Sequence, residues 1–234
     1  RLRAPTEQDP LTERDLESKY GKTSRMPVRM ALAVLAGEGL IRQRARYGYW
    51  LVEYDLDDVA QILAMRAGIE AMIVDALSSK HVSSWENDEA EGNPSESQRA
   101  AWAEALDALK KMERLARITG GVDERELTAR FADEDTRFHA SLARAADYDL
   151  AARHIGEWRG QARVYALQSG VSARASLGTI NREHGALVRV IRKGDGSSAV
   201  ARSRTHLEKA LGRYRSTRRR PARTSSRRRA VASG

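Results

Sequence analysis

The sequence predicts a mainly α protein in which an N-terminal winged helix-turn-helix precedes an all-helical antiparallel bundle. Two observations predict this class. Residues 11–53 follow the order helix, turn, helix and hairpin, and from residue 55 onward the apolar residues recur at helical spacing. We expect three parts: a winged unit at 1–54, a helical unit at 55–216 and a disordered basic tail at 217–234.

Composition limits the class of protein further. The chain has 234 residues, of which 41% are hydrophobic, enough for one large domain or two small ones with packed cores. It has no cysteine, which excludes disulfides and thiolate chemistry. It has no run of about eighteen apolar residues and no secretory signal at its start, so we expect a cytoplasmic protein with no membrane partner. The sequence does not start with Met, and we expect its N-terminal segment to be incomplete.

The formal net charge of +9 is concentrated at the C-terminus. Residues 213–234 contain 9 arginines and no acidic residue, so the rest of the chain is neutral overall. Residues 1–54 carry 10 basic against 7 acidic residues, whereas residues 55–212 carry 22 against 25. The winged unit is therefore the basic half of the folded chain. The tail has too few large apolar residues to fold alone, and it serves either as a solubilising segment or as a sequence-independent contact to DNA phosphates.

Two short helices open the winged unit. The segment "LTERDLESKYG" predicts the first, because Thr12 is placed as its N-cap with Asp15 three residues later. The segment "TSRMPVRMALAVLAGEGL" predicts the second, because Val28, Leu32 and Leu35 recur at helical spacing before a glycine. A turn at "KTS" separates the two helices.

A β-hairpin follows in "LIRQRARYGYWLV". Ile41, Gln43 and Ala45 alternate with arginines, which is the period of a strand, and "RYG" supplies a turn before the return strand. This hairpin completes the pattern of a winged helix-turn-helix.

Arginine recurs on each exposed element of the winged unit. Arg25 and Arg29 lie four residues apart, on one side of the first turns of the second helix. A recognition helix presents donors from its N-terminal end to the major groove, and the guanidinium group matches guanine edges and phosphates. We therefore expect double-stranded DNA to be bound by five arginines: Arg25, Arg29, Arg42, Arg44 and Arg46. The same residues would also fit an ordinary solvated surface.

The rest of the chain predicts about six antiparallel helices. The first begins at residue 55, and five more are expected over 99–118, 125–146, 148–168, 179–193 and 197–216. The polar segment 78–98 is expected to be a long exposed loop.

Four residues of the helical unit have the spacing of a metal site. Asp135 and His139 lie four residues apart on one helical face. His184 and His206 are equally far from the turn "GDG", so an antiparallel helical pair would place them at the same height. One carboxylate and three imidazoles suit Zn²⁺, Ni²⁺, Mn²⁺ or Fe²⁺, with open positions for water or a small carboxylate. The alternative, four unrelated core or surface side chains, stays open.

A metal site could also belong to an enzyme, because a bound ion can activate water. Asp133 and Glu134 adjoin the candidate ligands, but their helical angles aim them elsewhere. An enzyme would also leave the winged unit unexplained, so we do not expect one. A metal-dependent enzyme with an accessory DNA-binding segment and a metal-free ligand sensor of the same fold are the alternatives.

Several segments resemble one known family. "LTERDL", "SRMPVRMALAVLAGEGLI" and "RYGYWLV" resemble the winged-helix domain of the GntR family of bacterial transcription regulators. "RAGIEAMIVDAL", "DTRFHASLARA" and "EHGALVRVIRKGD" resemble the FCD effector domain of its FadR-like subfamily. The resemblance covers nearly all of residues 8–212. It implies a homodimer that binds a near-palindromic operator, and we expect a repressor controlled by a small organic acid held at a divalent metal ion.

The resemblance also assigns residues. By match of motif, the expected DNA contacts are Arg14, Ser24, Arg25 and Arg29, with Gly48 at the wing tip in the minor groove. The expected metal ligands are Asp135, His139, His184 and His206, and Arg66 matches a position near the effector pocket. The chain departs from the family pattern in five ways. "GKTSR" is one residue longer than usual, Met30 replaces an acidic residue, and the family's first helix is missing. The loop "ENDEAEGNPSES" is longer than usual, and Tyr148 stands where an asparagine is common.

Overall fold

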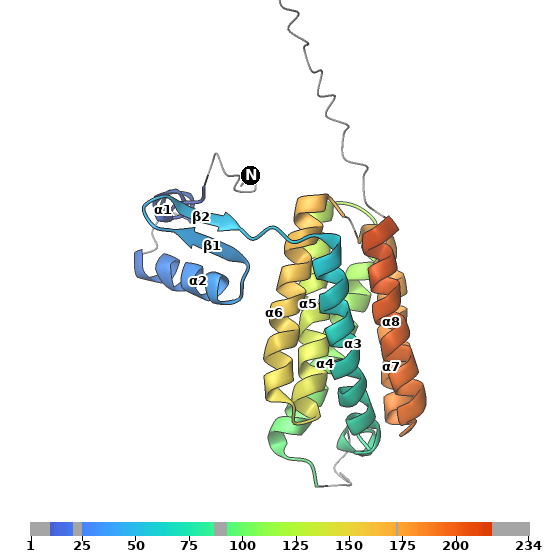
Figure 1. Cartoon of the computed structure of the whole chain (residues 1–234). Coiled ribbons are helices and arrows are strands. Elements are labelled where there is room, and N and C mark those ends of the chain that lie inside the picture. The colour runs from blue at the N-terminus through green and yellow to red at the C-terminus, as the bar shows by residue number, and fades with distance from the viewer. Residues whose placement is uncertain (1–9, 21–24, 87–92, 172, 217–234) are drawn as a thin grey trace, which may run out of the picture.

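The computed structural model describes residues 10–20, 25–86, 93–171 and 173–216. A small winged unit is joined to a larger helical bundle by the segment after the second strand (Figure 1). The mainly α class predicted from the sequence is confirmed. The predictions on Ser24 and on the tail at 217–234 fall outside the described residues and stay predictions.

The winged unit contains two helices and a two-stranded sheet. Its elements are α1 (Glu13–Tyr20), α2 (Arg25–Gly37), β1 (Ile41–Arg44) and β2 (Gly48–Leu51). The backbone N–H of Asp15 donates to Thr12 Oγ1 at 3.1 Å, and the backbone N–H of Thr12 donates to the Asp15 carboxylate at 3.2 Å. This reciprocal pair fixes the start of α1 where the sequence predicts it.

A small apolar core holds α2 against the hairpin. Val28 and Leu32 of α2 are buried together with Ile41 and Tyr49 of the two strands. Because the buried residues of α2 lie on one side of the helix, its opposite side faces away from this core.

The two strands pair antiparallel along their whole length. Gly48 has a φ of 117°, and a Cβ there would lie 2.8 Å from the carbonyl oxygen of Leu11, so the position needs glycine. In β1 only Ile41 is buried. The predicted alternation is therefore wrong at Gln43, which is exposed because the hairpin extends past the small core.

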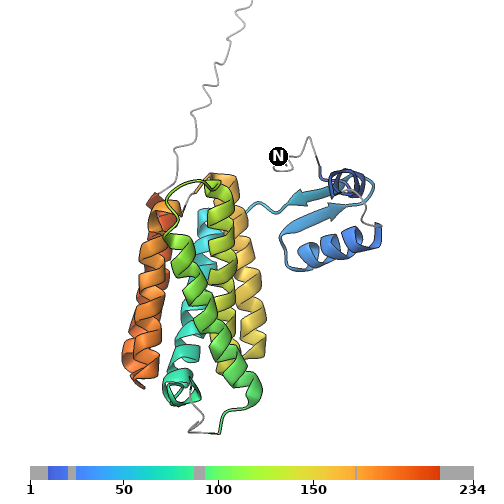
Figure 2. The same ribbon diagram turned by 180° about the vertical axis from the view of Figure 1, so that it is seen from behind.

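Six long helices form the bundle within the described residues (Figures 1 and 2). They are α3 (Leu56–Ser78), α4 (Glu96–Ala116), α5 (Glu124–Ala145), α6 (Asp149–Ser169), α7 (Leu177–Arg192) and α8 (Gly196–Ser216), with a short 3₁₀ turn, η2 (Arg174–Ser176), before α7. The boundaries of α4 to α8 differ from the predicted ones by at most 3 residues. Trp102, Phe138 and Met112 are fully buried in the bundle core. None of the helices in the described part of the chain is long and apolar enough to cross a membrane.

The exposed loop predicted over 78–98 is wrong in part. A short 3₁₀ turn, η1 (Ser84–Glu86), lies within it, and both Val82 and Trp85 are buried in the bundle core. The indole N–H of Trp102 donates to the carboxylate at the end of η1 at 3.1 Å. Two apolar residues give no periodic signal in a sequence, yet their burial holds residues 82–86 against the bundle.

Helix α6 contacts the winged unit through two glutamines. The Gln161 amide donates to the carbonyl oxygen of Glu38, just after α2, at 3.1 Å. The Gln168 amide donates to the carbonyl oxygen of Val52, just after β2, at 2.9 Å. The bundle is therefore hydrogen-bonded to the backbone of the winged unit just after α2 and just after the hairpin.

Candidate metal centre and DNA-facing residues

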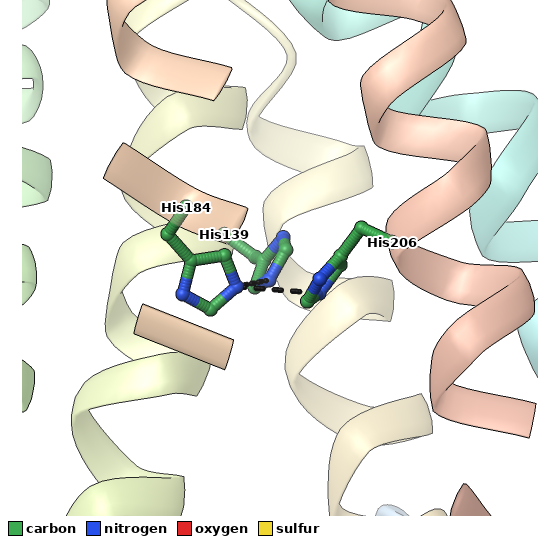
Figure 3. Close-up of side chains that lie close together, drawn as sticks. All are labelled: His139, His184 and His206. Atoms are coloured by element: carbon green, nitrogen blue, oxygen red, sulfur yellow. Dashed lines mark hydrogen bonds between the residues drawn. The ribbon is translucent and has the colours of Figure 1, made fainter. Parts of the chain in front are cut away.

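Three histidines from three helices meet inside the bundle: His139 of α5, His184 of α7 and His206 of α8 (Figure 3). Nε2 of His184 lies 3.2 Å from Nε2 of His139 and 3.2 Å from Nε2 of His206. One ring nitrogen from each histidine lies within 4.8 Å of the others. Ligands bound about 2 Å from one ion are spaced in this way. The tight turn between α7 and α8 places His184 and His206 at the same height.

Asp135 reaches the same point from one turn before His139. Its Oδ1 lies 3.5 Å from Nε2 of His139 and 3.3 Å from Nε2 of His184. Within the described part of the chain, this buried oxygen has no hydrogen-bond partner. The structure thus brings together the four residues that the sequence singled out as metal ligands.

Two carboxylates behind the histidines fix the direction of their lone pairs. Nδ1 of His139 donates to Glu70 Oε2 at 2.8 Å, and Nδ1 of His206 donates to Glu183 Oε2 at 2.8 Å. Because an ionised carboxylate only accepts, both histidines carry their proton on Nδ1 and direct the lone pair of Nε2 to the centre.

His184 cannot donate a hydrogen bond to the Nε2 lone pairs of both His139 and His206. Its Nδ1 has no partner among the described residues, so its Nε2 can carry one proton and donate to one neighbour at a time. At least one contact at 3.2 Å therefore brings two lone pairs together. A cation between them would remove this repulsion, so the residues present fit a divalent metal ion.

The protonation states also suit a metal site. Burial, with help from His206, lowers the pKa of the His184 imidazole well below its usual value. Burial alone would raise the pKa of the Asp135 carboxyl, but the charge of Arg159 and, after it, the nearby imidazoles hold it well below its usual value. At neutral pH His184 is therefore neutral and Asp135 is ionised, and these are the forms that bind metal.

Arginines balance the carboxylates of the centre. The pairs are Asp135 with Arg159, Glu70 with Arg66, and Glu183 with Arg213. In the Arg66 pair Nε lies 2.7 Å from Glu70 Oε1, both side chains are buried, and Nη2 of Arg66 has no partner within the described residues. Each of the three carboxylates thus faces an arginine, and Glu183 also lies 3.5 Å from Nζ of Lys209, so a divalent ion would make the centre positive.

Little space is open at the centre itself. The cavity beside His139 and Glu70 measures about 10 Å³, which is close to the minimum for one water molecule. A larger hollow of about 290 Å³ lies on the outer side of His206 between α7 and α8, lined also by Glu183, Arg202 and Lys209. Arg66 reaches the candidate centre through Glu70, and the cavity beside Glu70 is too small for an acid, so its expected place near an effector stays a prediction.

Four charged residues around the centre were missed by the sequence analysis: Glu70, Glu183, Arg159 and Arg213. Glu70 follows Arg66 by four residues, and this buried ion-pair spacing was the only available signal. Glu183 adjoins His184 in the sequence, but it contacts His206 on the next helix, and no local spacing signals that contact. Nothing in the sequence links Arg159 of α6 to Asp135 of α5.

The expected DNA-contacting residues that the structure describes are on the surface of the winged unit. Arg14 of α1 and the hairpin arginines Arg42, Arg44 and Arg46 are exposed. Nε of Arg29 lies 2.8 Å from the Glu13 carboxylate, and 58% of the Arg29 side chain is exposed. Gly48 packs against the segment before α1, so the wing tip is formed by Arg46 and Tyr47 instead. Nothing is described for the Arg25 side chain.

The sequence matches the FCD domain family over residues 61–209. Among curated proteins, none matches the sequence significantly.

Solved structures share the fold over most of the chain. A protein from Rhodococcus sp. RHA1, described as a GntR transcriptional regulator, is 17% identical with a TM-score of 0.64, covering 92% of this chain and 90% of that one. McbR/YncC from E. coli is 13% identical with a TM-score of 0.66, covering 92% and 89%. Lar from Listeria monocytogenes is 17% identical with a TM-score of 0.51, covering 92% and 89%.

Proposed function

This chain belongs to the GntR family of transcription regulators, in the subfamily with an FCD domain, and we propose that it represses its target genes by binding an operator as a homodimer. In this proposal the winged unit binds double-stranded DNA through its exposed arginines. The helical unit holds a divalent metal ion and, through it, a small carboxylate that weakens or repositions the dimer on DNA.

The observation that carries the metal proposal is the convergence of three buried histidines with Asp135. Nε2 of His184 lies 3.2 Å from Nε2 of each of the other two histidines, and His139 and His206 are oriented by carboxylates. Nε2 of each histidine and Oδ1 of Asp135 would be the ligand atoms. The bound ion would supply open positions for a small acid.

Charge favours a carboxylate as the effector. Because arginines already balance the carboxylates, a divalent ion gives the centre a net positive charge in a low-dielectric interior. An anion gains from this charge, whereas an amine is repelled. Arg66, with its unpartnered Nη2, would contact the acid after a local rearrangement that enlarges the small cavity.

Metal analysis and melting curves of the purified full chain test the metal proposal. We expect close to one divalent ion per chain, and we expect a chelator to lower Tm because the ion binds only the folded state. His184→Ala should remove both the metal and the chelator effect. His154→Ala, which changes an exposed histidine of α6, is the matched control and should leave both unchanged. A metal-free protein with no chelator effect would instead support the metal-free sensor.

A gel-shift experiment with the DNA upstream of the chain's own gene tests the operator proposal. Specific binding at moderate salt supports it, and binding that competes equally with unrelated DNA refutes it.

A further inference from the structure

The outward side of α2 carries a stripe of exposed apolar side chains. Met26, Met30 and Val34 follow one another at intervals of four residues and are 62%, 63% and 58% exposed. At this spacing they share one face of a helix. Large apolar side chains that gather on one surface mark an interaction site more often than single ones do.

This stripe lies directly opposite the core-facing side of α2. Each residue of an α-helix is rotated by about 100° from the one before it. Ala33 and Gly37 therefore also lie on the side of α2 that is opposite to Val28 and Leu32, and both are exposed. These five residues form one arc of the helix surface. Within residues 26–37, no side chain on this arc can donate or accept a strong hydrogen bond. Arg29 lies at the edge of the arc, where Glu13 holds its Nε.

The electrostatic character of the unit favours DNA as the occupant of this face. Residues 1–54 carry 10 basic against 7 acidic residues, so a second copy of the unit placed on the face would be repelled. A nucleic acid would be attracted. A helix of about 10–12 Å diameter also fits the major groove, which is about 12 Å wide.

We infer that α2 reads thymine in the major groove, through contact of Met26 and Met30 with the C5-methyl groups. This inference rests on the proposed function, in which the winged unit binds an operator. Among base edges in the major groove, only thymine offers an apolar group, so an apolar helix face can select only thymine there. The arginines at the rim and on the hairpin then supply contacts to phosphates and guanine. Each operator half-site accordingly contains thymine where the middle of α2 crosses the groove.

Deoxyuridine substitution isolates the methyl group. The full chain is first used to select binding sites from random double-stranded DNA, and each thymine of the selected half-site is then replaced by deoxyuridine, which lacks only the methyl group. At one or two thymines we expect affinity to fall about fourfold per half-site, the worth of one buried methyl-sized group. Substitution in both half-sites should then lower the affinity for the site about fifteenfold.

Variants link the effect to the helix face. Met30→Ala should weaken binding to the thymine site and abolish the penalty for deoxyuridine at the position it contacts, as a double-mutant cycle requires. Met72→Ala, a matched change at a methionine of α3 that is 57% exposed, should leave both unchanged.

Three results would overturn the inference. If the chain selects a specific site whose affinity is unaffected by deoxyuridine at every thymine, the face does not read methyl groups, although the operator proposal stands. If Met26→Ala and Met30→Ala change the oligomeric state and leave specificity intact, the face is an interface between copies of the chain. If no specific site can be selected, the proposed function itself fails.

Discussion

Glu70→Gln separates the two tasks that the structure gives to this buried carboxylate. Glu70 orients His139 through Nδ1 and neutralises Arg66, and only 4–5% of the Glu70 and Arg66 side chains is exposed. The glutamine keeps the size and can still accept the hydrogen bond from His139, but it leaves Arg66 as a buried, unpaired charge. Burial already lowers the pKa of Arg66, and Glu70 opposes this shift.

The expected magnitudes follow from these contacts. Removing one partner of a buried ion pair costs about 3–5 kcal/mol of unfolding free energy. For a chain of this size that corresponds to a fall in Tm on the order of 10 °C. Weakening the carboxylate behind a metal-binding histidine costs about 10–100-fold in metal affinity. Calorimetry of the metal-free protein and competitive metal titration measure the two effects independently.

Two further variants make the test selective. Glu113→Gln breaks an exposed pair with Arg117 on α4 and should change Tm little. The double variant Glu70→Gln with Arg66→Met removes the unpaired charge, so it should regain most of the lost stability while metal affinity stays low. If Glu70→Gln melts like the wild type and binds metal equally well, the negative charge of Glu70 neither strengthens the metal ligand His139 nor balances Arg66, and the reasoning is refuted.

Four further outcomes follow from the structure. Because burial lowers the pKa of His184 and His206, the unfolded chain binds more protons there, and the metal-free protein should lose stability as pH falls below about 6.5; a denaturation midpoint constant from pH 7.5 to about 5.5 would contradict this. Arg29→Ala should weaken specific operator binding by about 1–3 kcal/mol per half-site in a binding titration, and an unchanged Kd would remove Arg29 from the interface. Deletion of residues 217–234 should weaken binding equally for all sequences and reduce its salt dependence, whereas altered specificity with an unchanged salt slope would exclude phosphate contact. Gln161→Ala should leave metal binding intact but reduce the effect of a bound acid on DNA affinity, and an equal response in the variant would show that this contact transmits nothing.

Sequence reasoning located the parts of the centre that local spacing controls. Asp135 and His139 are one helical turn apart, and a short turn sets His184 against His206. These relations depend only on helix geometry, which the sequence pattern reveals. The contribution of Glu70 depends on how α3 packs beside α5, a long-range arrangement that no spacing encodes.

The same limit explains the missed segment before α4. Val82 and Trp85 are buried because the bundle offers an apolar surface at that height, and a polar local sequence does not disclose such a surface. Helix boundaries, in contrast, follow from local caps: Ser95 accepts from the backbone N–H of Gln98 while Gln98 accepts from that of Ser95.

Helix α6 joins the candidate centre to the winged unit within three consecutive residues. Arg159 pairs with Asp135, and Gln161 donates to the carbonyl oxygen of Glu38 after α2. Residues two apart on a helix point about 200° apart, so the two contacts leave α6 on opposite sides. One helix therefore lies between the centre and the unit proposed to bind DNA.

Close packing couples α6 to the winged unit. A Cβ on Gly160 would lie 3.1 Å from a methyl carbon of Leu40, so the backbone of α6 rests directly against the segment between α2 and β1. Close-packed elements shift as units rather than deform continuously. An acid that binds the metal and draws Arg159 away from Asp135 would thus move α6 against Leu40, and the end of α2 would have to follow. The last step of the proposed control, from α6 to the end of α2, would then run through contacts already present in the structure.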